Sequence, residues 1–476
     1  MPTKIWQPIA DIAAGVQNGQ LKASELVAEA LSIIDEQAEF QAIIAVTPGR
    51  ASQRAAEIDE RVAKGEQVGR LAGVPFIAKD NFLVFGAETT AASNILRGFK
   101  APYQSTAIQK LEAEGAICVA KANLDAFAHG SSTENSDFMT TKNPHDITKV
   151  PGGSSGGSAA AVVLGMAPFA LGTDTGGSIR LPASYCGAVG YKPTYGLVSR
   201  SGVVAMASST DVVGPLTRTV ADAALVLDVM AGQDPLDSTT IERQESYADL
   251  SDTDLTGKKI GIIREYMAEG LNEGVRTQIE TATEKLKNAG AEITEVSLPT
   301  LPLGLAVYYV LCPAEVSSNL SRYDGQRYGF TVTDAKSLDE SFKKSRSQGF
   351  GKEAKRRIMI GTYVLSSGYY DAYYKRAQIV RTKLIAEFAE AFEQVDFLLG
   401  PTAPSTAFAI GANADDPLQM YLTDIMTVAA NLSGVPAISV PAGVSEGMPV
   451  GLQIMAAQRN DKQLLQIADA VEDILG

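Results

Sequence analysis

Two glycine- and serine-rich motifs and one lysine are the residues of this chain that could do chemistry together. The first motif is Gly-Gly-Ser-Ser-Gly-Gly-Ser at residues 152–158, and the second is Asp-Thr-Gly-Gly-Ser-Ile-Arg at residues 174–180. Glycines on both sides of a serine let the backbone adopt unusual torsions and let another group approach closely. Successive amides in such a turn can converge on one oxygen, as an oxyanion hole requires. Because a serine hydroxyl alone is a weak nucleophile, the pattern also requires a neighbouring base.

Lys79 is the candidate for that base. It follows the apolar run 74–78 and precedes Asp80, and a lysine is rarely placed at the end of a buried strand without a purpose. Lysine can serve as a base when its surroundings keep it neutral. Histidine is scarce, with only His129 and His145, which disfavours a Ser-His-Asp site without removing it. We expect His145 in a surface turn and His129 in a structural role.

From the residues alone, two other interpretations of the glycine-rich motifs stay open. One is a phosphate-binding loop, although the order Gly-x-x-x-x-Gly-Lys-Ser/Thr is absent and Lys192 is followed by Pro193. The other is a structural glycine cluster without chemistry. A flexible linker is disfavoured because residues 151–215 include apolar runs of the kind that become buried.

The elements around these motifs predict an α/β fold. Short apolar runs separated by Gly, Pro and Asp are typical of buried strands, and helical periodicity occurs between them. We expect strands at 74–78, 116–120, 259–263, 291–296, 395–399 and 437–440. We expect helices at 9–36 (with Ser24 as a cap), 51–64, 106–114 and 274–289, and one long helix or a pair at 363–392.

Composition limits the classes of function. The formal net charge of −14 argues against binding nucleic acid without a partner, because phosphate affinity depends on clustered Lys and Arg. Three scattered cysteines predict buried free thiols in a reducing cytosol and no cysteine-rich zinc site. No metal ligand set is expected. Residues 1–10 lack a secretory pattern, and no run is long enough to predict a membrane span, so we expect a cytoplasmic protein.

The run 152–201 resembles the signature segment of the amidase signature family, and residues 73–81 resemble that family's lysine segment. The resemblance implies one α/β domain around a mixed, twisted sheet of about eleven strands flanked by helices. We expect N-terminal helices over about 1–65, a catalytic core over about 66–225, and a part over about 255–476 that completes the same domain. It also implies Ser178 as nucleophile, Ser154 as bridging serine after a cis Gly153–Ser154 bond, and Lys79 as base. The expected oxyanion donors are the amides of Thr175, Gly176, Gly177 and Ser178, with Ser155 and Asp174 as supports.

Outside these motifs, the chain from about residue 26 onward resembles the family of glutamyl-tRNA(Gln) amidotransferase A subunits. The resemblance rests on five segments, at 130–136, 317–325, 355–359, 361–366 and 369–374. It implies that L-glutamine is hydrolysed and that ammonia passes to a B subunit. That partner uses ATP and Mg to activate the glutamate of Glu-tRNA(Gln), while a small C subunit braces the pair. No cofactor is expected on this chain.

The same resemblance suggests which residues bind glutamine. Arg357 matches the partner of the α-carboxylate, Asp424 the partner of the α-ammonium, and Tyr309 a polar wall. An exposed helix arginine and a helix N-terminal aspartate are the structural alternatives. Ala429, where proline is common, and the pair Ala128-His129 depart from the pattern without touching the triad. A stand-alone amidase for another small carboxamide and a non-catalytic scaffold remain alternative functions.

Overall fold

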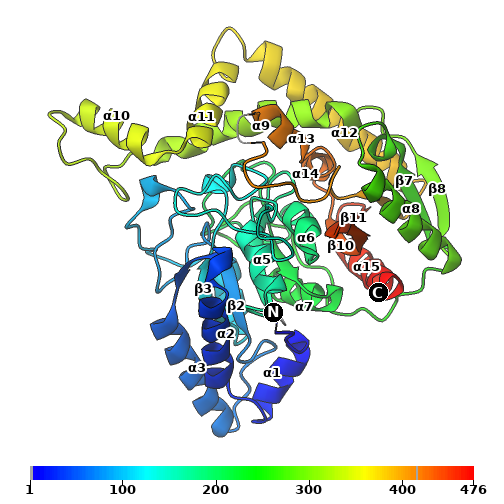
Figure 1. Ribbon diagram of the computed structural model, residues 1–476, viewed down its shortest axis with the longest axis horizontal. Coiled ribbons are helices and arrows are strands. Elements are labelled where there is room, and N and C mark those ends of the chain that lie inside the picture. Colours follow the sequence, from blue (N-terminus) through cyan, green and yellow to red (C-terminus); the bar gives the residue numbers. More distant parts are fainter. Residues whose placement is uncertain (1–3, 414–415) are drawn as a thin grey trace.

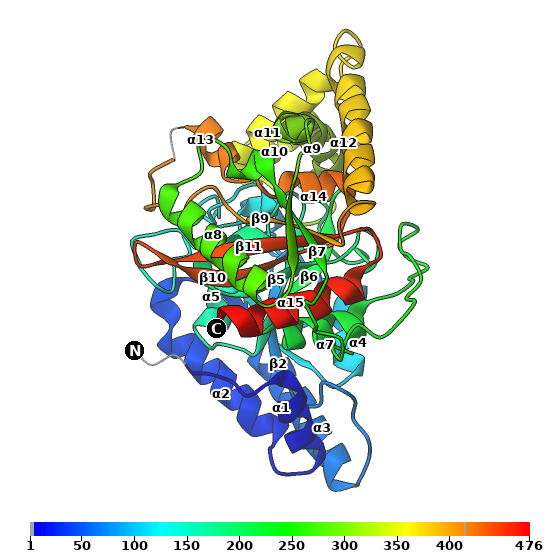
Figure 2. The same ribbon diagram turned by 90° about the vertical axis from the view of Figure 1, so that its right-hand side faces the viewer.

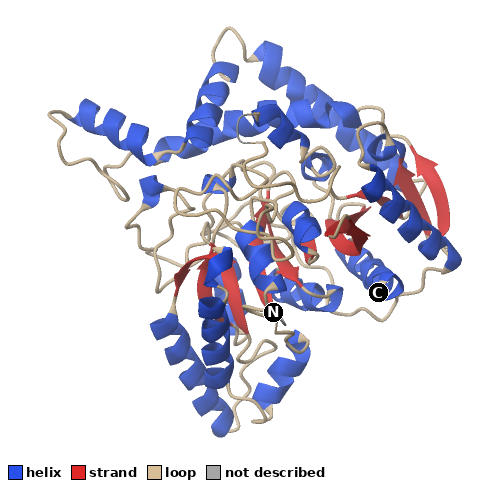
Figure 3. Ribbon diagram, viewed as in Figure 1, coloured by secondary structure: helices blue, strands red, loops and turns tan. Residues whose placement is uncertain are grey.

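One mixed sheet of eleven strands forms the centre of the computed structural model, which describes residues 4–413 and 416–476. Figure 3 shows this sheet enclosed by helices. From one edge to the other, the strands are β1 (Ile43–Val46), β3 (Ile117–Ala122), β2 (Pro75–Lys79), β4 (Phe169–Asp174), β6 (Val212–Thr217), β5 (Val189–Lys192), β10 (Ala437–Ser445), β11 (Met448–Ala456), β9 (Phe397–Pro401), β7 (Lys259–Ile263) and β8 (Glu292–Val296). The predicted fold class is confirmed.

Strand direction changes several times across the sheet. Strand β2 is parallel to both β3 and β4, and β7 is parallel to β8 and β9. The remaining pairs are antiparallel, including the pair between β5 and β10 that joins the two halves of the sequence. This continuous sheet supports the prediction of a single domain with the three parts given above, which stays a prediction.

Helices enclose the sheet, and Figures 1 and 2 show them in two perpendicular views. They are α1 (Ile9–Gln17), α2 (Ala23–Glu36), α3 (Pro48–Ala63), α4 (Thr106–Ala113), α5 (Gly156–Val163), α6 (Arg180–Cys186), α7 (Val220–Met230), α8 (Glu273–Asn288), α9 (Gly304–Asn319), α10 (Leu338–Gly349), α11 (Lys352–Val364), α12 (Arg376–Phe392), α13 (Pro417–Leu422), α14 (Val428–Ser433) and α15 (Asp461–Leu475). Helix α5 packs against β4 and β2, α15 packs against β10 and β11, and α9, α11 and α12 pack together at the top of Figure 1.

Two expectations about the helices are wrong. The helix predicted over 9–36 is broken into α1 and α2, because Gly19 adopts a positive φ of 71°. Ser24 does not cap α2, since that helix begins at Ala23; the Ser24 hydroxyl instead donates to Asp59 of α3 at 2.6 Å. Of the two forms allowed for 363–392, the structure has one long helix that starts later than predicted: α11 ends at Val364, and a π-helical turn at Asp371–Lys375 runs directly into α12.

One helical stretch, Leu301–Arg322, is long and apolar enough to cross a membrane by length and composition, with a mean hydropathy of 1.3. Half of its most apolar window is buried inside the fold. It includes α9, which packs against α11, α12 and α14. A buried core helix passes the same test, so this stretch is weak evidence for a membrane segment.

Candidate active site

The three residues predicted to form a triad lie near the carboxyl ends of two adjacent strands, β2 and β4, and near the start of helix α5. Lys79 is the last residue of β2, and Ser178 lies four residues after the end of the adjacent strand β4. Ser154 lies two residues before α5, the helix that leads into β4. Both strands consist of buried residues only, and their parallel pairing brings their carboxyl ends to one edge of the sheet. The fold therefore gathers residues that are separated by up to about a hundred positions.

Lys79 is fully buried among hydroxyl and carbonyl oxygens. Its Nζ donates to Ser154 Oγ at 2.7 Å, to Ser155 Oγ at 2.8 Å and to Thr173 Oγ1 at 3.0 Å. Burial lowers the pKa of Lys79 from 10.5 to about 7, although the carboxylates of Asp125, Asp174 and Asp211 act in the opposite direction. The amine can therefore be neutral near physiological pH, and its closest neighbour is the Ser154 hydroxyl.

Ser178 is the most accessible of the three, with 7% of its surface exposed where Lys79 and Ser154 have none. Its carbonyl accepts from the Ser155 amide at 3.1 Å, which ties the two serine motifs together. Among the described residues its hydroxyl makes no hydrogen bond, so the side chain is free to meet a substrate. The peptide between Gly153 and Ser154 is cis, as the family resemblance implies.

Glycine is required in the loop before Ser178 for two reasons. Gly177 has a φ of 137°, and a Cβ there would overlap the Thr427 hydroxyl. A Cβ on Gly176 would come within 2.6 Å of the Tyr308 ring. The Gly177 amide was predicted to be an oxyanion donor, but it already donates to Asp174, at 2.9 Å. Thr175, Gly176 and Ser178 are the other predicted donors.

A buried ion pair supports this loop. Asp174, at the end of β4, accepts from the side chain of Arg180 through both carboxylate oxygens, at 2.9 and 3.0 Å, and from the Ile179 amide at 3.1 Å. Burial alone would raise the pKa of Asp174, but the charge and hydrogen bonds of Arg180 outweigh it and hold the pKa at about 2. Arg180 in turn donates to Thr427, Asn431 and Gln453. The carboxylate is thus charged at neutral pH and fixes the backbone on both sides of Ser178.

A cavity of about 170 Å³ contains Arg357 and Tyr309, two of the residues predicted to bind substrate. Arg357 on α11 is 2% exposed, which excludes the alternative of an exposed helix arginine. Its guanidinium lies 5.4 Å from the Tyr309 ring and 5.7 Å from the Tyr421 ring, and its Nε donates to Glu353 at 2.9 Å. Arg357 is therefore held in one orientation, with guanidinium N–H groups available to a ligand.

Asp424 adjoins this cavity through Tyr309, whose hydroxyl donates to Asp424 at 3.1 Å. The residue lies between α13 and α14 and is 8% exposed. Burial raises the pKa of Asp424 to about 7, against the opposing effects of Tyr309 and Arg357. The Thr427 hydroxyl is within hydrogen-bonding distance of both the Asp424 carbonyl, at 3.1 Å, and the Gly176 carbonyl, at 2.6 Å. The predicted substrate residues are thereby connected to the loop that carries Ser178.

The cavity also reaches toward the bridging serine. Ser132 lines it, and a Cβ on Gly153 would come within 2.6 Å of the Ser132 amide. Asp125 lies on the same side, where it accepts from the amides of Thr133 at 2.9 Å and Asn135 at 3.1 Å. Burial raises the pKa of Asp125 to about 6. The cavity that contains Arg357 therefore lies close to the Gly153–Ser154 segment.

Sequence reasoning did not identify several residues of this site. Thr173 and Asp125 surround Lys79, Arg180 holds Asp174, and Glu353 with Tyr421 orients Arg357. The pairing of Arg180 with Asp174 could have been predicted, because the two residues are six positions apart in a glycine-rich turn and the arginine can fold back onto the aspartate. Glu353 also had a local signal, because it lies four residues before Arg357 on α11. Tyr421 contacts Glu353 from a distant segment, which leaves no local signal.

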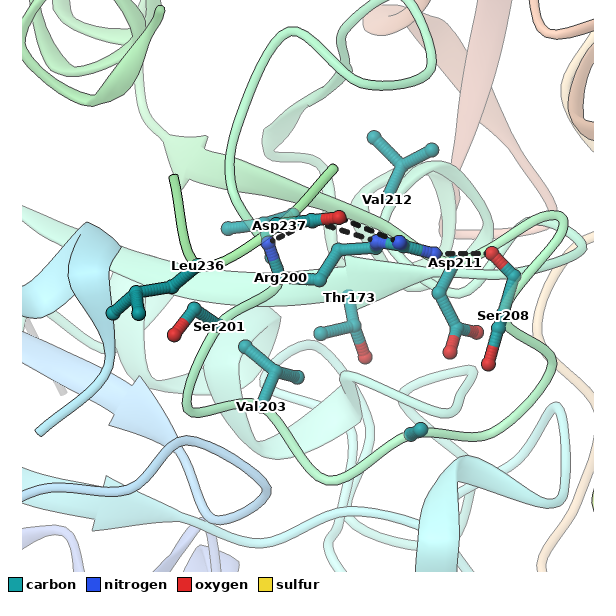
Figure 4. Close-up of a pocket in the computed structure, with 11 residues that line it drawn as sticks. Thr173, Arg200, Ser201, Val203, Ser208, Asp211, Val212, Leu236 and Asp237 are labelled. Atoms are coloured by element: carbon teal, nitrogen blue, oxygen red, sulfur yellow. Dashed lines mark hydrogen bonds and ion pairs between the residues drawn. The ribbon is translucent and has the colours of Figure 1, made fainter. Parts of the chain in front are cut away.

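A second cavity, of about 190 Å³, is lined by Thr173 and Asp211 (Figure 4). Thr173 is also the residue whose hydroxyl accepts from Lys79. Arg200 crosses it and pairs with Asp237 through two hydrogen bonds, at 2.8 and 2.9 Å. Asp211 accepts from the Thr175 hydroxyl at 2.7 Å, and burial raises the pKa of Asp211 to about 6. Polar residues therefore approach the base and the predicted oxyanion loop from this side too.

The histidines do not form a Ser-His-Asp site. His145 is exposed, as expected, and its Nε2 contacts the Cys186 carbonyl. His129 is buried, and neither ring nitrogen has a partner among the described residues. The three cysteines are free and buried, as predicted. Within residues 4–413 and 416–476, no cluster of three or more His, Cys, Asp or Glu could hold a metal ion.

Comparisons with known proteins agree with this geometry. The family model described as Amidase matches residues 25–465. The A subunit of glutamyl-tRNA(Gln) amidotransferase from Alkaliphilus metalliredigens is 50% identical over 98% of this chain and 96% of its own length. The crystal structure of the corresponding A subunit from Thermotoga maritima superposes with a TM-score of 0.80 at 42% identity, over 95% of this chain and 91% of that one. Peptide amidase from Stenotrophomonas maltophilia superposes with a TM-score of 0.83 at 31% identity, over 98% and 97%. The chain is therefore an amidase: it belongs to the Amidase family and, within that family, to the glutamyl-tRNA(Gln) amidotransferase A subunits.

Proposed function

We propose that this chain hydrolyses L-glutamine and supplies the ammonia with which an amidotransferase converts Glu-tRNA(Gln) to Gln-tRNA(Gln). The observation that carries the proposal is the buried Lys79 Nζ, 2.7 Å from Ser154 Oγ and with a pKa near 7. That pair stands beside a cavity with a fixed arginine, which suits an amino-acid amide. The near-full-length similarity to A subunits favours this function over a stand-alone amidase or a non-catalytic scaffold.

Lys79 acts as the base. When it is neutral, its two N–H groups donate to Ser155 and Thr173, which leaves the lone pair to accept the Ser154 proton. Ser154 then accepts the proton of Ser178 as the Ser178 oxygen bonds to the amide carbonyl carbon. Collapse of this intermediate breaks the C–N bond, and the proton returns through Ser154 to the leaving ammonia. Water attacks the acyl-enzyme by the same relay and releases glutamate.

The oxyanion that forms during attack is stabilised by backbone amides of the loop 175–178. Thr175, Gly176 and Ser178 are the donors, while the Gly177 amide, through Asp174, keeps the loop in shape. Ser155 and Asp174 support the catalytic groups without reacting. The hydrogen bonds of the Gly177 and Ile179 amides to Asp174 support this assignment, because they hold the loop on both sides of Ser178.

Arg357 binds the α-carboxylate of glutamine, Asp424 the α-ammonium, and Tyr309 forms the wall between them. The guanidinium is fixed by two aromatic rings and Glu353, so little conformational entropy is lost when it binds a carboxylate. A simple aliphatic amide would leave both charges without partners, and the site would reject it.

Each of these relatives is named as one subunit of a larger enzyme. We place this chain in the same setting, in the cytoplasm with a B and a C subunit. The partner binds ATP and Mg and holds the tRNA, since the formal charge of −14 makes this chain a poor tRNA ligand.

Ser178→Ala tests the proposal. The change removes one heavy atom, so fold and subunit contacts should persist while the acyl-enzyme cannot form. With its partner subunits, the variant should make no Gln-tRNA(Gln) from glutamine but should still make it from concentrated ammonium salt. Retention of the glutamine-driven reaction would assign the nucleophile elsewhere. Loss of both reactions would give Ser178 a role beyond ammonia release, and failure of the unmodified chain in both would favour the stand-alone amidase.

A further inference from the structure

The connection between α11 and α12 carries an unusual set of exposed aromatic and apolar side chains. We call residues 359–379, the end of α11, its connection and the start of α12, the tyrosine hairpin. It lies at the upper edge of the molecule in Figure 1. Every residue from 365 to 373 is exposed. The most exposed large side chains are Met359 at 73% and Ile379 at 54%, with Tyr363, Tyr369, Tyr370 and Tyr373 at 42–47%.

Three of these rings form a cluster on the surface. The centroids of Tyr363 and Tyr369 are 4.2 Å apart, and the centroid of Tyr373 lies 6.0 and 6.1 Å from them. Tyrosine rings that pack together while nearly half exposed have their shape set before any partner arrives, which reduces the entropic cost of binding. A contiguous apolar surface of this kind marks interaction sites in soluble proteins.

The opposite face of α11 is buried, so this helix is firmly attached to the rest of the fold. Arg357, Gly361 and Val364 follow one another at helical spacing and are buried. A Cβ on Gly361 would overlap the carbonyl of Pro313 in α9, which shows how closely the two helices pack. Helix α11 therefore presents Arg357 to the cavity on one side and the tyrosine hairpin to solvent on the other.

Charge distinguishes this region from the rest of the chain. Between residues 352 and 383, six cations are exposed and one carboxylate, Asp371, is exposed. The cations are Lys352, Lys355, Arg356, Lys375, Arg376 and Lys383. The whole chain has a formal charge of −14, so a basic surface is set in an acidic molecule. A partner that covers it would be apolar at the centre and acidic at the rim.

We infer that the tyrosine hairpin is the docking surface for a second protein chain with such an apolar centre and acidic rim. The inference rests on the proposed function, which requires a partner subunit. Tyrosine, methionine and arginine are the side chains enriched at the core of protein interfaces. Exposed Met359 and Ile379 favour a protein over a nucleic acid, because aliphatic side chains offer bases no stacking surface. Docking here also places the partner one helix away from Arg357.

The experiment measures binding of the co-expressed B and C subunits to purified variants of the full chain. Tyr369→Asp combined with Tyr373→Asp should raise Kd by about 30-fold or more, as loss of central aromatic anchors does. Lys375→Glu combined with Arg376→Glu should weaken binding as well and reduce its dependence on salt. Tyr103→Asp, at a tyrosine 53% exposed on another segment, is the matched control and should bind normally.

Thermal unfolding of each variant checks folding, and the charge-reversal pair replaces the tyrosine pair if the latter is unstable. Normal partner binding by both hairpin variants overturns the inference. So does a self-dimer of the unmodified chain that the hairpin variants dissolve, or a tRNA affinity of the isolated chain that they abolish while partner binding persists. If the unmodified chain binds neither the B nor the C protein, the proposed function fails and the surface fails with it.

Discussion

The acid side of the pH profile of glutamine hydrolysis should report the protonation of Lys79. Only the neutral amine can accept the Ser154 proton, and burial places the pKa of Lys79 at about 7. With that pKa, roughly a tenth of the enzyme is competent at pH 6 and roughly nine tenths at pH 8. At saturating glutamine, where Asp424 is already paired with the substrate, kcat should therefore rise about tenfold between these values, with a slope of one proton.

The same burial makes Lys79 costly for the fold. A pKa of about 7 in place of 10.5 corresponds to about 5 kcal/mol in favour of the neutral amine. Between pH 10.5 and 7 the unfolded chain binds this proton more readily than the folded chain, so stability falls as the pH decreases through that range. Lys79→Met should therefore unfold at an equal or higher temperature than the unmodified protein at pH 7, even though it loses the relay.

Lys79→Arg separates charge from base chemistry. Arginine keeps a positive charge at any pH of the assay, so the variant should lose about 10²–10⁴-fold in rate, as severely as Lys79→Met. Glutamate release in the presence of the partner subunits is the assay, with thermal unfolding as the control for folding. Near-normal hydrolysis by Lys79→Arg, or a rate independent of pH between 6 and 8, would remove lysine from the proton relay.

Two further predictions concern substrate binding and the support of the loop. Arg357→Ala and Asp424→Asn should each raise the KM for glutamine by about 30-fold or more, because loss of one partner of a buried charged contact costs about 2–5 kcal/mol; an unchanged KM in both variants would place the pocket elsewhere. In the unmodified enzyme KM should fall as pH rises through about 7, where Asp424 ionises, and Asp424→Asn should remove that dependence. Asp174 has a pKa depressed from 3.8 to about 2, so it contributes about 2 kcal/mol of stability that is present above pH 4 and lost as the pH falls toward 2. Asp174→Asn leaves Arg180 buried without a counter-ion and should lower stability by about 3–5 kcal/mol at neutral pH, measured by denaturant unfolding.

Strands β2 and β7 were predictable from the sequence because each coincides with a short apolar run. Strand β7 occupies the predicted residues, and β2, which ends at Lys79, lies one residue beyond its expected position. Strand β4, which leads to Ser178, was not among the predicted strands. The break after α1 was not predicted, since the apolar pattern continues across Gly19 and only the backbone of the folded chain selects a turn there.

The site was predictable where the chemistry is local. Glycines beside Ser154 and Ser178 indicated tight turns, and the lysine at the end of a buried run indicated a base. What the sequence could not provide are the contacts that join distant segments, such as Tyr421 to Glu353 or Arg180 to Gln453. Such pairs meet only in the folded chain, so no local pattern indicates them.

The side chain of Arg180 has a consequence for attempts to redesign this enzyme by recombination. It binds Asp174 beside the nucleophile loop, yet its other partners, Thr427, Asn431 and Gln453, belong to the last fifty residues or so of the chain. A chimaera that takes its C-terminal segment from another amidase, to import that enzyme's substrate preference, also replaces the acceptors that hold this guanidinium. The donor segment must therefore supply equivalent acceptors at all three places. Otherwise the graft would alter the geometry at Ser178 from a distance, and an inactive chimaera would be mistaken for one with the wrong pocket.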